Sequence, residues 1–261
     1  MSLANHYLSM HLEDVPGPDG ANAIGRLTIS REERRNAIST SMWSCIPEYL
    51  AELKEKGARV MVLTGSNSCF ASGADIEDLK VIADLKGATK FWHAIRDCLQ
   101  FIYTFPLPVI AMIDGPCIGG GCLLATACDF RIASSNSVFG IPVAKLGIVL
   151  DDASVLRLVH LIGPAQASLM LYTGNVVDAA RAMQLGLIND VLPEDKLESG
   201  VKEICNSIAS NAYGSIFESK RSIRRACTAG HEDMSDLLPQ HESVVLASYL
   251  TSDFKQRVGI R

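Results

Sequence analysis

Strands alternating with helices are the feature that most constrains the fold of this chain. Short β-branched, apolar runs occur at AIGRLTISR (23–31), RVMVLTGS (59–66), PVIAMIDG (108–115) and FRIAS (130–134), and the last three end in turn residues. Helical patterns lie between them at 41–57, closed by Gly57, and at 89–105, stopped by Pro106. This order predicts an α/β fold with largely buried parallel strands.

The chain beyond residue 150 has a different pattern. Apolar spacing predicts helices at 153–163, 164–174 and 178–186, and in the long stretch 194–227. We expect no further strand there. We also find no Pro/Ser-rich linker, so this helical third should attach directly to the α/β part as a cap or an assembly surface.

Composition excludes several classes of protein. The chain has 261 residues, 48% of them hydrophobic, and a formal net charge of −5, which disfavours nucleic-acid binding. The basic stretch KRSIRR (220–225) is interpreted as a solvated helix face. No apolar run approaches the roughly 20 residues that span a bilayer, so no membrane association is expected. No Lys or Arg precedes Arg26, which argues against a secretory or transit signal.

Eight cysteines occur, and none forms a CxxC pair. Most lie among apolar residues, which favours buried, reduced thiols over a zinc site or a disulfide framework. We therefore expect a cytoplasmic protein with no metal.

Three consecutive glycines, Gly119 to Gly121, follow the strand PVIAMIDG and open an apolar helix. Glycine costs helix stability, but at a helix start it lets a ligand oxygen approach the unpaired N–H groups directly. A second strand, RVMVLTGS, leads into NSCFASGADIEDL (67–79), which again has a free backbone amide beside a glycine. Two such donors on one carbonyl oxygen form an oxyanion hole.

The sequence lacks the motifs that mark other kinds of glycine-rich site. The sequence has no GxGxxG after its first strand, no GxxxxGK[ST] and no GxSxG, and HExxH is also missing. Dinucleotide binding, a P-loop, a nucleophile elbow and a zinc protease site are therefore not expected.

The two glycine-rich segments together resemble the crotonase (enoyl-CoA hydratase/isomerase) superfamily. CFASGADIEDL and PVIAMIDGPCIGGGCLLATACDFRIAS resemble its two oxyanion motifs, and RRNAIS (34–39) resembles its substrate loop. The resemblance implies a spiral of ββα turns over 1–195 and a helical C-terminal region over 196–261. That region would support trimerisation and cap the active site. It also implies a homotrimer or a dimer of trimers, and an acyl-CoA substrate as the small-molecule partner, with no cofactor beyond the coenzyme A moiety.

The same resemblance implies particular site residues. The hole donors would be the N–H groups of Ala74 and Gly120. Arg34 and Arg35 could pair with coenzyme A phosphates. The expected substrate-binding residues are Arg35, Ala37, Ala71, Gly73, Asp75, Ile76, Ile118, Gly119, Leu123, Pro142, Val143 and Leu150. Asp75 and Asp129 also stand at element boundaries, where aspartate caps or anchors a turn.

Two positions depart from the hydratase pattern. Hydratases of this superfamily carry two glutamates, and Leu123 and Val143 occupy those positions here. Neither side chain can transfer a proton, so the two-glutamate hydration mechanism is not available. Asp151, in LGIVLDDASVLRLVHLIG (146–163), falls where several isomerases place their acid/base carboxylate. We assign catalysis to Asp151 and helix capping to Asp152.

The resulting expectation is an enzyme that stabilises an enolate and shifts the double bond of an unsaturated acyl-CoA, with Asp151 as acid/base. A hydratase with a non-standard site, other thioester chemistry and a non-catalytic acyl-CoA-binding subunit remain alternatives.

Overall fold

A computed structural model describes residues 6–15, 22–228, 244–249 and 251–257. The strands are β1 (Leu8–Val15), β2 (Asn22–Ile29), β3 (Ala58–Gly65), β4 (Val109–Ile113), β5 (Pro116–Ile118), β6 (Phe130–Ser134), β7 (Val138–Gly140), β8 (Val177–Asp178) and β9 (Asp190–Leu192). The helices are α1 (Thr40–Glu55), α2 (Ile76–Lys80), α3 (Leu85–Thr104), α4 (Gly120–Ala127), α5 (Asp152–Thr173), α6 (Ala179–Leu185), α7 (Glu194–Ala209), α8 (Tyr213–Thr228) and α10 (Ser252–Arg257), with 3-10 turns η2 (Glu32–Arg34) and η3 (Val143–Leu146).

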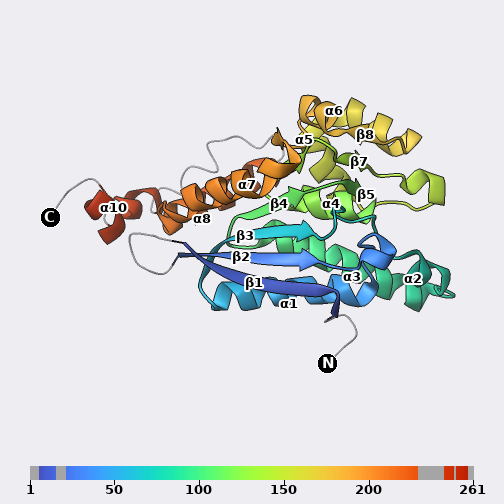
Figure 1. Cartoon of the computed structure of the whole chain (residues 1–261), viewed down its shortest axis with the longest axis horizontal. Coiled ribbons are helices and arrows are strands. Elements are labelled where there is room, and N and C mark those ends of the chain that lie inside the picture. The colour runs from blue at the N-terminus through green and yellow to red at the C-terminus, as the bar shows by residue number, and fades with distance from the viewer. Residues whose placement is uncertain (1–5, 16–21, 229–243, 250, 258–261) are drawn as a thin grey trace.

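Two sheets organise the described chain (Figure 1). The larger has the order β1-β2-β3-β4-β6-β9, and only its β1–β2 pair is antiparallel. The smaller has the order β5-β7-β8. The α/β class and the parallel strands are as predicted, but the expectation of no strand after residue 150 was wrong. β8 and β9 have two and three residues, too few to show alternation.

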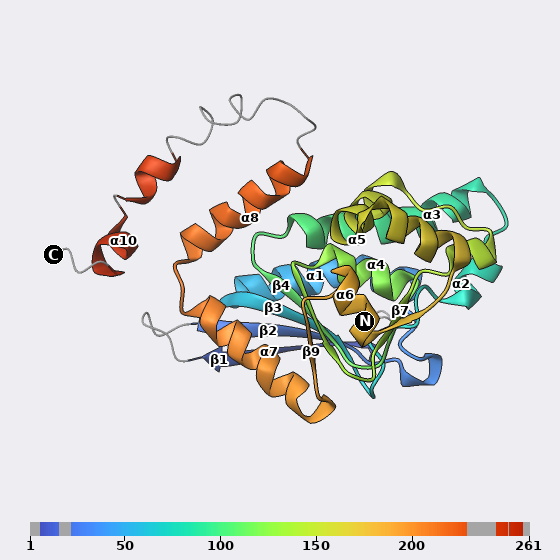
Figure 2. The same ribbon diagram turned by 90° about the horizontal axis from the view of Figure 1, so that it is seen from above.

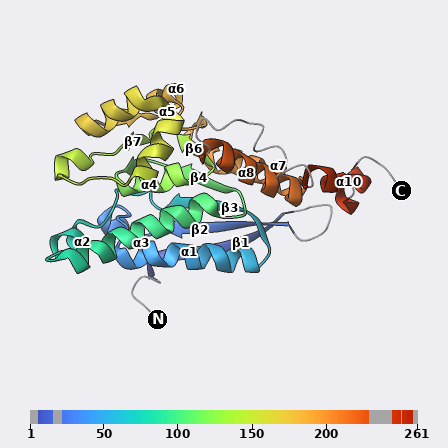
Figure 3. The same ribbon diagram turned by 180° about the vertical axis from the view of Figure 1, so that it is seen from behind.

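The large sheet buries both of its faces. Along β3, Met61 and Leu63 face the main core, whereas Val60 and Val62 face a second cluster that includes Leu197, Val201 and Cys205 of α7. Figure 3 shows α1 and α3 side by side along one face, and Figure 2 shows α7 crossing the strands on the other. The expected domain boundary at 195/196 therefore falls inside α7, whose first turns pack on the sheet with the α/β part.

The apolar helix α5 departs from the expectation that no run approaches bilayer length. It has 22 residues and a mean hydropathy of 1.3 over its most apolar window, so length and composition alone would let it cross a membrane. Its backbone is interrupted at Gly163, where φ is 74° and ψ is 162°. The break divides α5 into the two helical segments predicted from the sequence, each about half of a membrane span.

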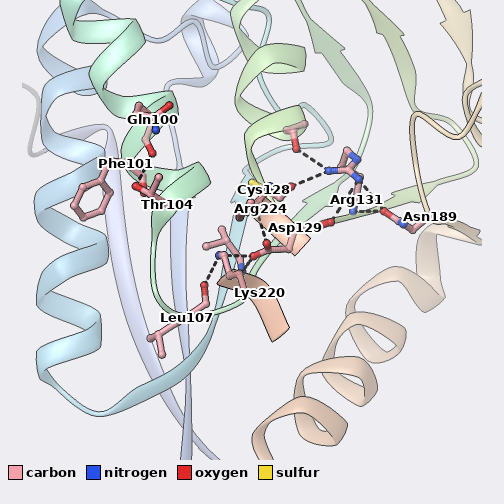
Figure 4. A network of polar contacts seen from close by, with 12 residues as sticks. Gln100, Phe101, Thr104, Leu107, Cys128, Asp129, Arg131, Asn189, Lys220 and Arg224 are labelled. Carbon is pink, nitrogen blue, oxygen red and sulfur yellow. Dashed lines mark hydrogen bonds and ion pairs between the residues drawn. The ribbon is translucent and has the colours of Figure 1, made fainter. Parts of the chain in front are cut away.

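Asp129 anchors α8 to the core (Figure 4). Its carboxylate accepts hydrogen bonds from Lys220 Nζ and Arg224 Nη2, each at 2.6 Å, and from the Val109 amide at 2.8 Å. Lys220 also donates to the Leu107 carbonyl and is only 9% exposed, so burial lowers the pKa of its ammonium. The interpretation of KRSIRR as a solvated face was therefore wrong for these two cations, because both turn inward.

The C-terminal end of α4 is fixed by buried Arg131 (Figure 4). Its guanidinium donates to the carbonyls of Cys128 and Leu187 and to the side-chain oxygen of Asn189. Burial lowers the pKa of Arg131, while the carbonyls around it satisfy its donors. A cation at this end also complements the helix dipole. The helix whose other end carries the three glycines is thus rigidly placed.

Candidate active site

One cavity of about 760 Å³ contains nearly all of the expected site residues. Its walls are the loop after η2, the segment around α2, the middle of α3, the β5–α4 turn, and residues from η3 to the start of α5. Every expected site residue lines it except Ala71. The lining is Arg34, Arg35, Ala37, Ser72, Gly73, Ala74, Asp75, Ile76, Glu77, Leu79, Lys80, Phe91, Trp92, Ile95, Ile118, Gly119, Gly120, Leu123, Pro142, Val143, Leu146, Ile148, Val149, Leu150 and Asp151.

Ala71 lies beneath the cavity and does not line it. Its side chain is completely buried, its amide donates to Pro116 O at 3.1 Å, and its carbonyl accepts from Ile118 N at 2.9 Å. Our expectation of a substrate contact at Ala71 was therefore wrong. Its position is structural, because these two bonds join the loop after β3 to β5.

The Ala74 amide is left open by the bonds on either side of it. Ile38 N donates to Gly73 O at 2.8 Å, and Asp75 N donates to Ile38 O at 3.0 Å, which forms a short parallel bridge. In such a bridge the middle residue directs its own N–H away from the partner strand. Within the described ranges, no hydrogen bond uses the Ala74 N–H, and the residue is only partly buried.

Each of the three glycines is required at its position for a different structural reason. Gly119 adopts φ 55° and ψ −121°, a conformation that side chains strongly disfavour, and its amide donates to Gly140 O. A Cβ on Gly120 would lie 3.1 Å from Ala74 N and 3.1 Å from Trp43 Cζ2. A Cβ on Gly121 would lie 2.4 Å from the Ala71 carbonyl oxygen. Only Gly120 therefore owes its lack of a side chain to the opposite amide.

The Ala74 and Gly120 amides are close neighbours at the cavity wall. Gly120 is the first residue of α4, so its N–H has no acceptor within the helix. It has no other acceptor in the part of the chain that the structure describes. Two open N–H groups and the positive end of a helix dipole thus meet at one place, which is the arrangement that stabilises a developing oxyanion.

Asn36 and Arg31 hold this wall in place, and neither was among the expected site residues. Asn36 is fully buried with φ 54°; its side chain donates to Ser66 O and Cys69 O and accepts from Arg31 N. Arg31 Nη1 donates to Ala37 O at 3.2 Å and to Asp75 Oδ2 at 2.6 Å. The sequence feature that could have drawn attention to Asn36 is its position in the RRNAIS stretch. Its burial and its side-chain hydrogen bonds, which explain its role, become visible only in the fold.

Asp75 lines the cavity, but its carboxylate is already used. It is the N-cap of α2, accepting from Glu77 N at 3.0 Å, and it forms the buried ion pair with Arg31. Burial alone would raise the pKa of the Asp75 carboxyl, but the bonds from the Glu77 amide and Arg31 outweigh it and lower that pKa. Asp75 is therefore a fixed anion that supports the loop carrying Ala74.

Asp151 lines the same cavity at the start of α5. Its Oδ1 accepts from Ser154 N at 3.0 Å and its Oδ2 accepts from Ser154 Oγ at 2.8 Å, so Asp151 is the N-cap. The assignment of capping to Asp152 was wrong; Asp152 is the first helical residue and is exposed. Each carboxylate oxygen keeps a second lone pair, so capping and proton transfer are compatible.

A buried cation lies behind Asp151. Arg157 is 7% exposed, approaches Ser154 Oγ with Nη2 at 3.4 Å, and stacks over the Tyr103 ring. Burial lowers the pKa of Arg157, and the nearby Asp151 charge opposes that shift. The Asp151 carboxylate is thus held by Ser154 in front of a positive charge.

Comparisons with known proteins identify the family of this chain. The family described as enoyl-CoA hydratase/isomerase matches residues 19–244. The chain belongs to the enoyl-CoA hydratase/isomerase family. An enoyl-CoA isomerase/hydratase of Mycosarcoma maydis is 33% identical over 79% of this chain and 77% of that protein. A short-chain-enoyl-CoA hydratase of Clostridium acetobutylicum is 33% identical over 77% of this chain and 78% of that one.

The fold is shown by solved structures. The crystal structure of an enoyl-CoA hydratase/isomerase family protein from Hyphomonas neptunium has a TM-score of 0.84 and 31% identity, covering 94% of this chain and 91% of that chain. The spiral fold implied by the crotonase resemblance is therefore confirmed, together with a helical C-terminal region. None of the cavity lining comes from described residues after Asp151, so the described part of that region does not cap the cavity.

The cavity also contains Leu123 and Val143, the two positions at which we expected a departure from the hydratase pattern. Leu123 is 6% exposed on α4 and Val143 is half-buried at the start of η3, and both line the cavity. Three acidic residues also line it, namely Asp75, Glu77 and Asp151. Asp75 is held by Arg31, and Glu77 is exposed and pairs with Lys80 and Arg34. Asp151 is the remaining carboxylate of the lining.

Proposed function

We propose that this chain is an acyl-CoA isomerase that moves the double bond of an unsaturated acyl-CoA from the β,γ to the α,β position. The observation that carries the proposal is the combination of one available carboxylate, Asp151, with apolar side chains at Leu123 and Val143. A double-bond shift needs one proton acceptor that can return the proton to a different carbon. Hydration by the family's usual route needs two groups that hold and activate water.

The proposed reaction uses Asp151 and the two amides in turn. Asp151 removes a proton from the α-carbon, and the electron pair of that C–H bond moves toward the thioester carbonyl. The amides of Ala74 and Gly120 stabilise the negative oxygen of the resulting dienolate. Protonated Asp151 then returns the proton to the γ-carbon, which leaves the double bond conjugated with the thioester. No oxidant or reductant is consumed.

The coenzyme A end of the substrate would meet the basic side of the cavity. Arg34, Arg35 and Lys80 all line it, and arginine can bind phosphate with two parallel hydrogen bonds. Glu77 lies between Arg34 and Lys80, at 3.8 Å and 3.0 Å. A bound phosphate would compete with Glu77 for these two cations.

We also propose an oligomeric state and a cellular compartment, from the exposed apolar side chains and from the cysteines. Large apolar side chains of α5 and its surroundings are exposed in a single chain, which supports assembly into a trimer or a dimer of trimers. They are Leu156, Leu169, Tyr172, Val176 and Met183. Five cysteines are buried as free thiols and three are partly buried, which supports a reducing compartment such as the cytoplasm.

The test is conversion of a β,γ-enoyl-CoA to its α,β isomer by wild type and Asp151→Asn. Asparagine caps helices as well as aspartate, so the variant should fold. We expect kcat to fall about 10²–10⁴-fold, the usual contribution of a positioned acid/base group, with little change in KM. Asp152→Asn is the matched control, because that side chain is exposed one residue away, and it should retain wild-type kcat.

Three results would contradict the proposal. Asp151→Asn with full activity would remove Asp151 from the chemistry, and brisk hydration of crotonyl-CoA with no isomerisation would assign a hydratase with a non-standard site. Tight acyl-CoA binding with no turnover of any thioester would indicate a binding subunit instead.

A further inference from the structure

The side of the cavity formed by α3 and the segment after η3 is apolar throughout. α3 contributes Phe91, Trp92 and Ile95, and residues 146–150 contribute Leu146, Ile148, Val149 and Leu150. The polar lining lies elsewhere, at the two amides, at Asp151, and at the basic residues near Arg34. Among these seven side chains the Trp92 indole N–H is the one hydrogen-bonding group, so a ligand portion lying against these two walls should be mainly hydrocarbon.

Both walls expose large apolar side chains to solvent at the cavity rim. The exposed fraction is 44% for Trp92, 60% for Leu146 and 92% for Val149. Such exposure is unfavourable, and a hydrocarbon chain lying between the walls would cover it. These exposed side chains line the cavity together with its buried residues, so they can contact part of a chain that the buried residues alone would leave uncovered.

Trp92 is held in position by its neighbours. The Arg96 guanidinium lies 4.7 Å from the centre of the indole, and the His93 ring lies 5.1 Å from it on the same helix. A side chain restrained on one face by a cation offers its other surface at little cost in conformational entropy. This arrangement favours a fixed apolar wall.

We infer that the site selects acyl-CoA thioesters with an unsubstituted hydrocarbon tail of hexanoyl size or longer, and that Trp92 and Val149 determine this preference. The inference rests on the proposed acyl-CoA site and adds to it the class of acyl group. It separates this chain from the relative named a short-chain-enoyl-CoA hydratase.

The experiment measures dissociation constants by titration calorimetry for butyryl-, hexanoyl-, octanoyl- and decanoyl-CoA. These saturated thioesters have no double bond to move, so binding is measured whether or not the enzyme is an isomerase. Each methylene that becomes fully buried should tighten binding roughly fourfold. Because the rim stays partly open, we expect octanoyl-CoA to bind about tenfold or more tightly than butyryl-CoA.

The variants locate the effect. Trp92→Ala removes one wall and Val149→Asp adds a charge to the other; both positions are exposed, so the fold should persist. Each should reduce the octanoyl-to-butyryl ratio to about threefold or less, because the lost contacts are mainly those with the methylenes beyond the butyryl length. Leu85→Ala is the matched control, because Leu85 is an apolar residue of α3 that is 83% exposed and does not line the cavity. It should keep the wild-type ratio.

The outcomes are decisive in both directions. A flat series, a preference for butyryl-CoA, or a Leu85→Ala effect as large as that of Trp92→Ala would overturn the inference. A steep binding series in a protein that isomerises nothing would retain the tail site and reject the proposed reaction. Rapid isomerisation with no dependence on tail length would support the proposed reaction and reject the tail site.

Discussion

At the scale of single residues, the gap between Gly120 and Ala74 sets the geometry of the proposed oxyanion hole. A methyl group at position 120 would lie 3.1 Å from both Ala74 N and Trp43 Cζ2, so Gly120→Ala must displace one of them. We expect kcat to fall about 10²–10³-fold, as for loss of one oxyanion donor, with a smaller change in KM. Steady-state kinetics on a β,γ-enoyl-CoA, together with a thermal melt, would measure this.

The control for this substitution is Gly214→Ala. Gly214 lies on α8, and a Cβ there would meet no atom within 4 Å. Alanine should leave kcat unchanged and stabilise the helix slightly, because it restricts the unfolded chain. A Gly120→Ala enzyme as fast as wild type would remove the Gly120 amide from the mechanism.

Sequence reasoning worked at this scale where the signal was local. The crotonase resemblance implied Ala74 and Gly120 as donors, and their amides do lie close together at the cavity, whereas their role as donors stays a prediction. Ala71 and the capping role of Asp152 were wrong, because both depend on side-chain or backbone direction within a turn. Arg31 was missed because its importance comes from Asp75, which is far away in sequence.

At the scale of elements, the attachment of α8 depends on one carboxylate. Asp129 neutralises Lys220, which is 9% exposed, and also bonds to Arg224 of the same helix. In Asp129→Ala the buried Lys220 ammonium would lose its counter-charge, so we expect a loss of about 3–5 kcal/mol of unfolding free energy. Chemical denaturation would measure it.

Arg221→Ala tests whether the effect is specific to the buried pair. Arg221 pairs with Glu218 on the same helix, and its side chain is 53% exposed. Its removal should change stability by no more than about 0.5 kcal/mol. Equal losses of unfolding free energy in the two variants would contradict the assignment of this stabilisation to the buried Asp129–Lys220 pair.

The predictability of elements followed their length. α1 and α3 have enough turns for periodicity to show, and Ser39 and Asp84 cap them as such residues usually do. β8 and β9 gave no signal, because two or three residues carry no alternation. The stretch 194–227 divides into α7 and α8, a break that no strong helix terminator in the sequence announced.

At the scale of the whole molecule, the exposed face of α5 predicts assembly. Leu169 and Tyr172 are 57% and 78% exposed, and Leu156 adds a third large apolar side chain. A monomer would leave this surface in water, so we expect a trimer or hexamer in sedimentation velocity at micromolar concentration. Tyr172→Glu should shift the distribution toward monomer without unfolding, because the side chain is exposed. A wild-type monomer would contradict the expectation.

The positions of the two tryptophans have a spectroscopic consequence. The chain has only Trp43 and Trp92. Trp43 packs beneath Gly120 and is fully buried, whereas Trp92 stands at the open rim. Their emission should therefore differ in wavelength, with Trp43 to the blue and Trp92 to the red. In a Trp92→Phe protein the remaining signal comes from Trp43, next to Gly120, so it should report optically on ligand binding at the proposed oxyanion hole.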